Sequence, residues 1–147
     1  MQHWPFLSTH LLSTLIWLPM IGGALALMLG NRRAQTARWL ALTVALATFV
    51  LSIPLLTGFD YFTSGMQFVE RREWIPAYDI QYHLGADGIS VALIVLTTLT
   101  TALVLIGAWG SIDKRVSHYV AAFLFLEGLM IGVFAAVDAM LFYVFFE

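Results

Sequence analysis

Three carboxylates lie within the almost wholly apolar stretch that ends the sequence, residues 124–147. Glu127 lies inside the run, Asp138 divides it, and Glu147 closes it. A carboxylate in a membrane-spanning helix is energetically costly, so it needs a partner, a water-filled cavity or a role in moving ions. Protons and ions are handled by such residues in transporters. This stretch therefore holds the residues with the greatest potential for chemistry.

The spacing of the three acids gives their depth in a membrane. If Asp138 marks a turn between two antiparallel helices, Glu127 precedes it by eleven residues and Glu147 follows it by nine. At about 1.5 Å per residue, these separations correspond to depths of roughly 16 Å and 14 Å. Half of a hydrocarbon core of about 30 Å is about 15 Å. Both glutamates are therefore expected near the midplane, whereas Asp138 is interpreted as a helix cap with proton transfer as the alternative.

The composition indicates a membrane protein. Hydrophobic residues make up 61% of the chain and charged residues 11%, with a mean hydropathy of +0.87, which is too apolar for a soluble domain. A net charge of -2 without a basic run does not indicate nucleic-acid binding. The lack of cysteine excludes disulfides, iron–sulfur ligation and covalent haem attachment within this chain. We predict no metal or haem site from the four isolated histidines, His3, His10, His83 and His118.

Four segments are long and apolar enough to cross a bilayer as helices: 11–29, 39–57, 86–109 and 119–137. A fifth apolar segment begins at Asp138 and reaches only about 15 Å by residue 147. Two carboxylates left at the midplane are implausible for a finished protein. We therefore infer that the chain is an N-terminal piece of something longer.

The connections between these segments indicate orientation. The short turns 30–38 and 110–118 hold three arginines, and a lysine with an arginine, whereas the longer segment 58–85 holds only Arg71 and Arg72. Because cytoplasmic loops carry the excess of Lys and Arg, the two short turns are expected in the cytoplasm. The N-terminus and segment 58–85 are then expected in the periplasm. Alternating apolar and polar residues at 78–84 predict a strand, paired with 66–70 as a hairpin.

Local patterns in the third and fourth spans have structural interpretations. Asp87 precedes the third span and is interpreted as its N-cap. Ser90, Thr97 and Thr101 share one helical face and are expected to bond their own backbone or a neighbouring helix. Gly128 and Gly132 form a GxxxG spacing, which predicts a close helix approach.

Two groups of motifs resemble a known family. The first comprises Trp-Ile-Pro at 74–76, Tyr-His-Leu-Gly-Ala-Asp-Gly-Ile-Ser at 82–90, and Leu-Thr at 96–97. The second comprises Met-Ile-Gly-Val-Phe at 130–134, Asp138, and Leu-Phe-Tyr-Val-Phe-Phe-Glu at 141–147. Together they resemble the subunit M (mitochondrial chain 4) family of the proton-pumping NADH–quinone oxidoreductase, respiratory complex I. The resemblance covers essentially the whole chain.

The resemblance implies a fold and a place in the cell. Members of the family have fourteen helices, with two inverted repeats of five that begin at the fourth helix. Residues 1–118 then correspond to the three N-terminal helices with a periplasmic loop at 58–85, and residues 119–147 start the first inverted repeat. The expected fold is an all-α integral membrane protein with four complete transmembrane helices and the first half of a fifth. The expected location is the bacterial inner membrane, crossed several times with the N-terminus in the periplasm.

The resemblance also implies roles for the two midplane acids. Glu147 aligns with a glutamate on helix five that pairs in the family with a lysine on a later helix, and this pair is thought to drive proton transfer. No lysine lies in any span of this chain. Glu127 is a second candidate for proton transfer, with a helix-packing acid as the alternative. No cofactor is expected in this chain, because NADH, FMN, iron–sulfur clusters and quinone belong to other subunits.

The expected function is a proton-translocating membrane-arm subunit of complex I, a non-redox subunit of the NADH:quinone oxidoreductase that couples quinone reduction to proton pumping. Its expected partners are other membrane subunits of the complex, the lipid bilayer and protons. The 147 residues alone are not expected to be catalytic. Two alternatives stay open: a subunit of a multi-subunit cation/proton antiporter or of an energy-converting hydrogenase, and a truncated, non-transporting fragment.

Overall fold

The computed structural model describes residues 5–147, and the side chains from residue 9 onward. His3, one of the four histidines considered above, lies outside the described residues. Helices account for most of the chain, and the one sheet has two strands. In chain order the elements are α1 (Pro5–Leu29), η1 (Asn31–Arg33), α2 (Ala34–Thr57), β1 (Gln67–Ile75), η2 (Pro76–Tyr78), β2 (Ile80–Ala86), α3 (Gly88–Gly107), α4 (Val116–Ala135) and α5 (Ala139–Phe146).

Four helices are long and apolar enough to cross a membrane, as the sequence predicted. Three of them begin earlier than expected: α1 starts at Pro5 rather than residue 11, α2 at Ala34 rather than residue 39, and α4 at Val116 rather than residue 119. For α2 and α4, the positions of charged residues alone set the predicted start. The alanine, glutamine and arginine that open α2 are good helix formers, so the polar turn continues as helix. The all-α membrane fold is confirmed, with one small hairpin added to it.

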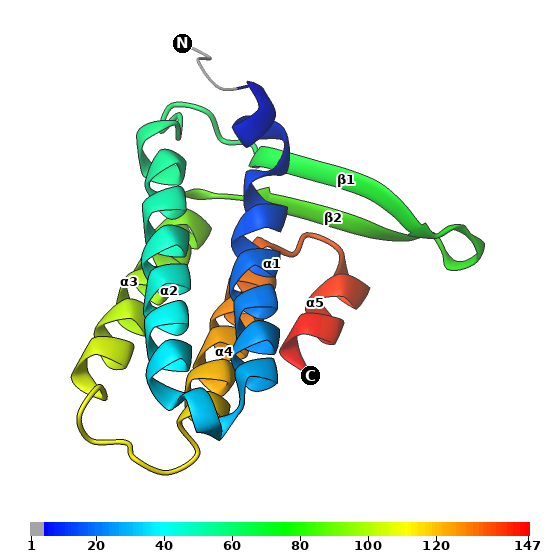
Figure 1. The fold of residues 1–147 in the computed structure, drawn as a ribbon. Coiled ribbons are helices and arrows are strands. Elements are labelled where there is room, and N and C mark those ends of the chain that lie inside the picture. Colours follow the sequence, from blue (N-terminus) through cyan, green and yellow to red (C-terminus); the bar gives the residue numbers. More distant parts are fainter. Residues whose placement is uncertain (1–4) are drawn as a thin grey trace.

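The helices form a bundle in which α1 lies against α4, and α2 lies between α1 and α3 (Figure 1). Near the hairpin, the core is built from large aliphatic side chains, such as Leu15, Ile94 and Ile131. Toward the other end, small side chains of α2 such as Ala37, Ala41 and Ala45 are fully buried. Small residues let membrane helices approach closely, which compensates for the weak hydrophobic driving force in lipid.

The two strands form the predicted antiparallel hairpin at one end of the bundle (Figure 1). Arg71 pairs with His83, and β1 extends to Ile75, beyond the predicted 66–70. The outer part of β1 was missed because its exposed residues do not alternate in polarity. The Val137 N–H donates to the His83 carbonyl at 2.9 Å, so the hairpin is joined to the turn between α4 and α5.

The two charged turns meet at the opposite end of the bundle (Figure 1). Arg38 donates to the Ile112 carbonyl, and its guanidinium lies 3.8 Å from the Asp113 carboxylate. The Ser117 hydroxyl donates to the Asn31 side-chain oxygen at 2.9 Å. The helix bundle therefore has the hairpin at one end and the two linked arginine-containing turns at the other.

Candidate functional site

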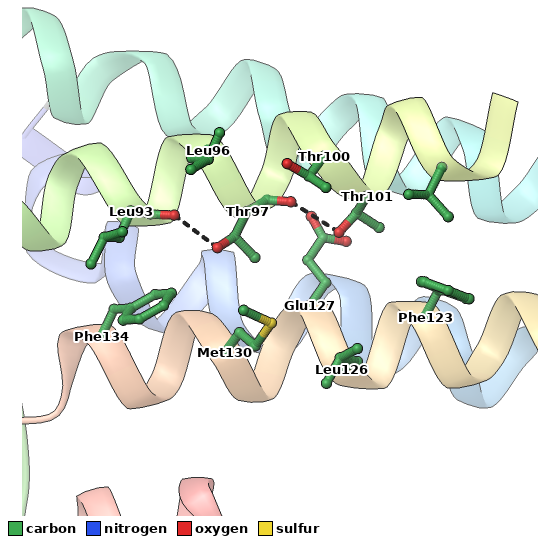
Figure 2. Close-up of a pocket in the computed structure, with 11 residues that line it drawn as sticks. Leu93, Leu96, Thr97, Thr100, Thr101, Phe123, Leu126, Glu127, Met130 and Phe134 are labelled. Atoms are coloured by element: carbon green, nitrogen blue, oxygen red, sulfur yellow. Dashed lines mark hydrogen bonds between the residues drawn. The ribbon is translucent and has the colours of Figure 1, made fainter. Parts of the chain in front are cut away.

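Glu127 lies near the middle of helix α4. Its side chain is only 1% exposed. It projects from α4 toward α3, beside Thr97 and Thr101 (Figure 2). The sequence predicted a midplane acid at this position, and the structure places it in the bundle interior.

A groove of about 240 Å³ runs between α3 and α4 along the Glu127 side chain. Its walls are mostly aliphatic and aromatic, and its polar lining is Glu127 with three threonines of α3 (Figure 2). The Thr97 hydroxyl donates to the Leu93 carbonyl at 2.7 Å, and the Thr101 hydroxyl donates to the Thr97 carbonyl at 2.9 Å. The expectation that these hydroxyls bond their own backbone is therefore confirmed for both residues.

The Glu127 carboxylate has neither a hydrogen bond nor an ion pair within the described part of the chain. Both of its oxygens are buried and unpartnered there. A helix interior offers no free N–H groups, because each backbone donor already bonds within the helix. A buried carboxylate without a partner is costly. The arrangement suits a group that exchanges a proton or meets a partner from outside these residues.

Glu147 lies at the end of the short helix α5. Its backbone N–H donates to the Tyr143 carbonyl at 2.9 Å, and its side chain is exposed. In Figure 2, α5 lies on the far side of α4 from the groove. The structure therefore does not bring Glu127 and Glu147 face to face, although their helices are in contact.

Asp138 caps helix α5. One of its carboxylate oxygens accepts from the Met140 N–H at 2.9 Å and from the Leu141 N–H at 3.3 Å. The interpretation of Asp138 as a helix cap is therefore confirmed. Its carboxylate is engaged with the backbone N–H groups at the start of α5.

A hydrogen-bonded cluster around Glu70 joins the hairpin to α1 and was missed by the sequence analysis. Glu70 is only 7% exposed; its carboxylate accepts from the Ser13 N–H at 3.1 Å and from the Ser13 hydroxyl. Tyr82 adds its hydroxyl 3.1 Å from that of Ser13 and accepts from the Trp17 indole N–H at 3.3 Å. The available signal was the hairpin pairing itself, because it places Glu70 opposite the apolar Leu84.

No group of three or more His, Asp or Glu side chains that could hold a metal ion occurs in residues covered by the structure. No protein-family model matches the sequence.

Several curated proteins that are similar in sequence to this chain carry one of two names. The chain is 45% identical to NADH-quinone oxidoreductase subunit M of Rhodobacter capsulatus, over 94% of the chain and 27% of that protein. It is 40% identical to NADH-ubiquinone oxidoreductase chain 4 of Arabidopsis thaliana, over 92% of the chain and 28% of that protein. It is 33% identical to subunit M of Rickettsia prowazekii (strain Madrid E), over 96% of the chain and 29% of that protein.

These matches confirm the resemblance that the motifs suggested. They cover only part of each relative. The chain spans between a quarter and a third of the length of the relatives it matches. Together with the four apolar helices, they identify a multi-pass membrane protein homologous to part of the subunit M and chain 4 sequences.

Proposed function

We propose, from the premise that this chain is homologous to part of NADH–quinone oxidoreductase subunit M, that it acts in a proton-translocating membrane-arm subunit of that complex. The observation that carries the proposal is the 45% identity to a subunit M over 94% of the chain. The buried Glu127, which has no partner among the described residues and lies near the middle of an apolar helix, supports it. A carboxylate in that position is typical of proton and ion pathways.

In the proposed mechanism, Glu147 is the main proton-exchanging group. It would pair with a cationic side chain on a later helix of the full subunit. Approach of that cation favours the ionised carboxylate and releases a proton, and its departure favours the protonated form. Glu127 would either continue the path or hold helices together. Redox chemistry, with its NADH, FMN, iron–sulfur clusters and quinone, would belong to other subunits.

The proposed setting follows from the two ends of the bundle. The hairpin and the N-terminus would face the periplasm, and the arginine-containing turns would face the cytoplasm of a bacterial inner membrane. The partners would be the other membrane subunits of the complex and the surrounding lipid. The relatives named above are all NADH oxidoreductase subunits, which favours this function over a cation/proton antiporter.

The test is Glu147→Gln in the full-length subunit, assembled into the complex. The number of protons moved per electron is expected to fall, because glutamine keeps the shape and loses the titrating group. Glu73→Gln, on the exposed part of the hairpin, is the matched control and is expected to leave the ratio unchanged. An unchanged ratio and electron-transfer rate in the Glu147 variant would overturn the proposal.

Glu127→Gln in the same assay separates the two roles of that acid. A lower ratio of protons to electrons in a complex of normal yield would place Glu127 on the pathway. A normal ratio with a lower yield of assembled complex would make it a packing acid.

A further inference from the structure

The α3–α4 groove has a polar lining that is short of donors. Its lining side chains with polar atoms are Glu127, Thr97, Thr100 and Thr101. The hydroxyl protons of Thr97 and Thr101 are already committed to backbone carbonyls of α3. Thr97 and Thr101 therefore have only oxygen lone pairs left to offer, and Glu127 adds a carboxylate whose oxygens are covered in the structure. An occupant that satisfies this lining must donate hydrogen bonds and carry positive charge.

The rest of the groove selects the shape of the occupant. Its remaining lining is apolar and includes Leu93, Leu96, Phe123, Leu126, Met130 and Phe134 (Figure 2). An aliphatic stem buries favourably against such walls while its charged tip reaches a polar group. A lysine combines a four-carbon stem with a compact ammonium that has three donors. An arginine fits less well, because its planar guanidinium has five donors to satisfy.

We propose that the α3–α4 groove receives a lysine side chain, carried by a membrane-spanning helix outside these 147 residues, whose ammonium pairs with Glu127. The chain's one lysine, Lys114, lies in the charged turn at the bundle end, so the partner comes from elsewhere. The groove flank supports a helical carrier, since Leu96 and Leu126 are half exposed there. The Glu127 oxygens are covered in the structure. The contact therefore requires the Glu127 side chain, which lines the groove, to change rotamer so that its carboxylate opens to the groove.

This partner is distinct from the cation proposed for Glu147, because Glu127 points toward α3 and α5 lies on the other side of α4 (Figure 2). The inference rests on the proposed function only in placing the chain within a larger membrane assembly. Pairing is expected whether or not Glu127 moves protons, since a buried carboxylate gains most from a partner that supplies both charge and donors.

The test uses native membranes that contain the full-length subunit and an apolar carbodiimide, dicyclohexylcarbodiimide. A Glu127 carboxylate oxygen adds to the carbodiimide carbon and forms an O-acylisourea. The lysine nitrogen then attacks the acyl carbon, an amide bond forms, the acyl–oxygen bond breaks, and dicyclohexylurea leaves with two protons of the ammonium. The pair loses one water in total, so mass spectrometry of digested membranes identifies an amide that joins the Glu127 peptide to a lysine peptide.

An amide link from Glu127 to a lysine of a membrane-spanning segment is the expected result. Absence of any such link, whether Glu127 becomes an N-acylurea or stays unmodified, would overturn the proposal. The readout is independent of pumping: the link can form in a complex in which Glu147→Gln leaves the proton ratio unchanged, and can be absent in one where it lowers the ratio.

Two tryptophan variants locate the lysine in the groove. Leu96 lines the groove and is 57% exposed, whereas Leu103 lies seven residues later on the same helix, is 58% exposed and does not line it. Leu96→Trp fills the groove and is expected to lower the yield of the Glu127 amide several-fold. Leu103→Trp is expected to leave the yield unchanged. Equal yields in the two variants would contradict entry of the lysine through this groove.

Discussion

The place of a carboxylate along a helix decides what surrounds it in this chain. Asp87 and Asp138 each precede the first residue of a helix, where backbone N–H groups lack intrahelical partners, and each accepts hydrogen bonds from them. Glu127 lies where all such groups are used, and it is unpartnered within the residues that the structure covers. The hydrogen bonds of Asp87 and Asp138 are therefore set by the adjacent helix start, whereas the surroundings of Glu127 are set by the packing of other helices.

Asp87 provides a residue-scale prediction of stability. Its carboxylate accepts from the Ser90 N–H at 2.7 Å, which satisfies one free donor at the start of α3. Asp87→Ala is expected to lower the free energy of unfolding by about 1 kcal/mol, the usual cost of losing an N-cap. Asp87→Asn is expected to retain most of the stability, because an asparagine oxygen caps a helix equally well. Thermal unfolding in detergent at neutral pH measures both.

The same residue predicts a pH dependence. The backbone N–H of Ser90 holds the pKa of Asp87 below its ordinary value of 3.8. Because the folded pKa is lowered, this contribution to stability is present above 3.8 and is lost as pH falls through the folded pKa. Below that pH, the Tm of the wild type should therefore fall relative to the Tm of Asp87→Asn. A difference that stays constant into that range would contradict the charged cap.

Local chemistry also explains which residues the sequence could identify. Both caps were predicted, because a capping acid and its helix are neighbours in sequence. The Glu70 cluster was not, since its Ser13 and Tyr82 partners come from α1 and from the other strand. The sequence also could not predict that the Glu127 carboxylate lacks a hydrogen-bond partner in the described residues, because this depends on how α3 and α4 are rotated about their axes. Sequence spacing predicted a depth for Glu127 and could not predict the groove that its side chain lines.

At the scale of elements, the two glycines of the GxxxG spacing contact different helices. A Cβ on Gly128 would lie 2.7 Å from the Ile16 carbonyl oxygen of α1, and a Cβ on Gly132 would lie 2.7 Å from the Phe145 ring of α5. The close approach predicted from the spacing is therefore present twice. Helix α4 therefore packs closely against the long helix α1 at Gly128 and against the short helix α5 at Gly132.

This difference predicts an order of damage. Gly128→Ala is expected to destabilise the bundle by about 1–3 kcal/mol, because overpacking here meets a backbone atom of α1 that cannot move alone. Gly132→Ala is expected to cost less, since Phe145 belongs to a helix of eight residues that can shift. Gly107→Ala is the control, because a Cβ added at this position would have no neighbour within 4 Å among the described residues. Tm values in detergent rank the three, and a larger loss for Gly132→Ala would refute this packing account.

The hairpin depends on its polar anchor to α1. Ser13→Ala removes the hydroxyl that Glu70 and Tyr82 share, and leaves a buried carboxylate with one donor fewer. A loss of about 1–3 kcal/mol in local stability follows from an unsatisfied buried partner. Faster amide hydrogen exchange in residues 67–86 measures it, while helix α2 should keep its protection. Thr63→Ala, in the exposed loop before β1, is the control and should exchange like the wild type.

At the scale of the whole molecule, most of the architecture could be predicted from the lengths of the apolar segments and the positions of the charged residues. Span number, the hairpin and the grouping of the two arginine-containing turns all follow from patterns within single segments. The order of packing does not, because the spans are apolar on nearly all sides, and the hydroxyl-bearing face of the third span does not say which helix it packs against. Small buried residues, such as Ala41 and Gly128, mark those faces only after the helices are placed.

The separation of the two ends leads to a prediction about orientation. The chain has no cysteine, so a single cysteine introduced by substitution reports its own side of the membrane. With the arginine-containing turns in the cytoplasm, Thr63→Cys should react with a membrane-impermeant maleimide in intact cells. Ser111→Cys should react only after the inner membrane is opened, because it lies in the turn at the other end of the bundle. Both side chains are exposed, so accessibility within the protein does not differ between them. The reverse pattern would invert the bundle and place the hairpin in the cytoplasm, and labelling of both sites from outside would contradict a bundle that crosses the membrane.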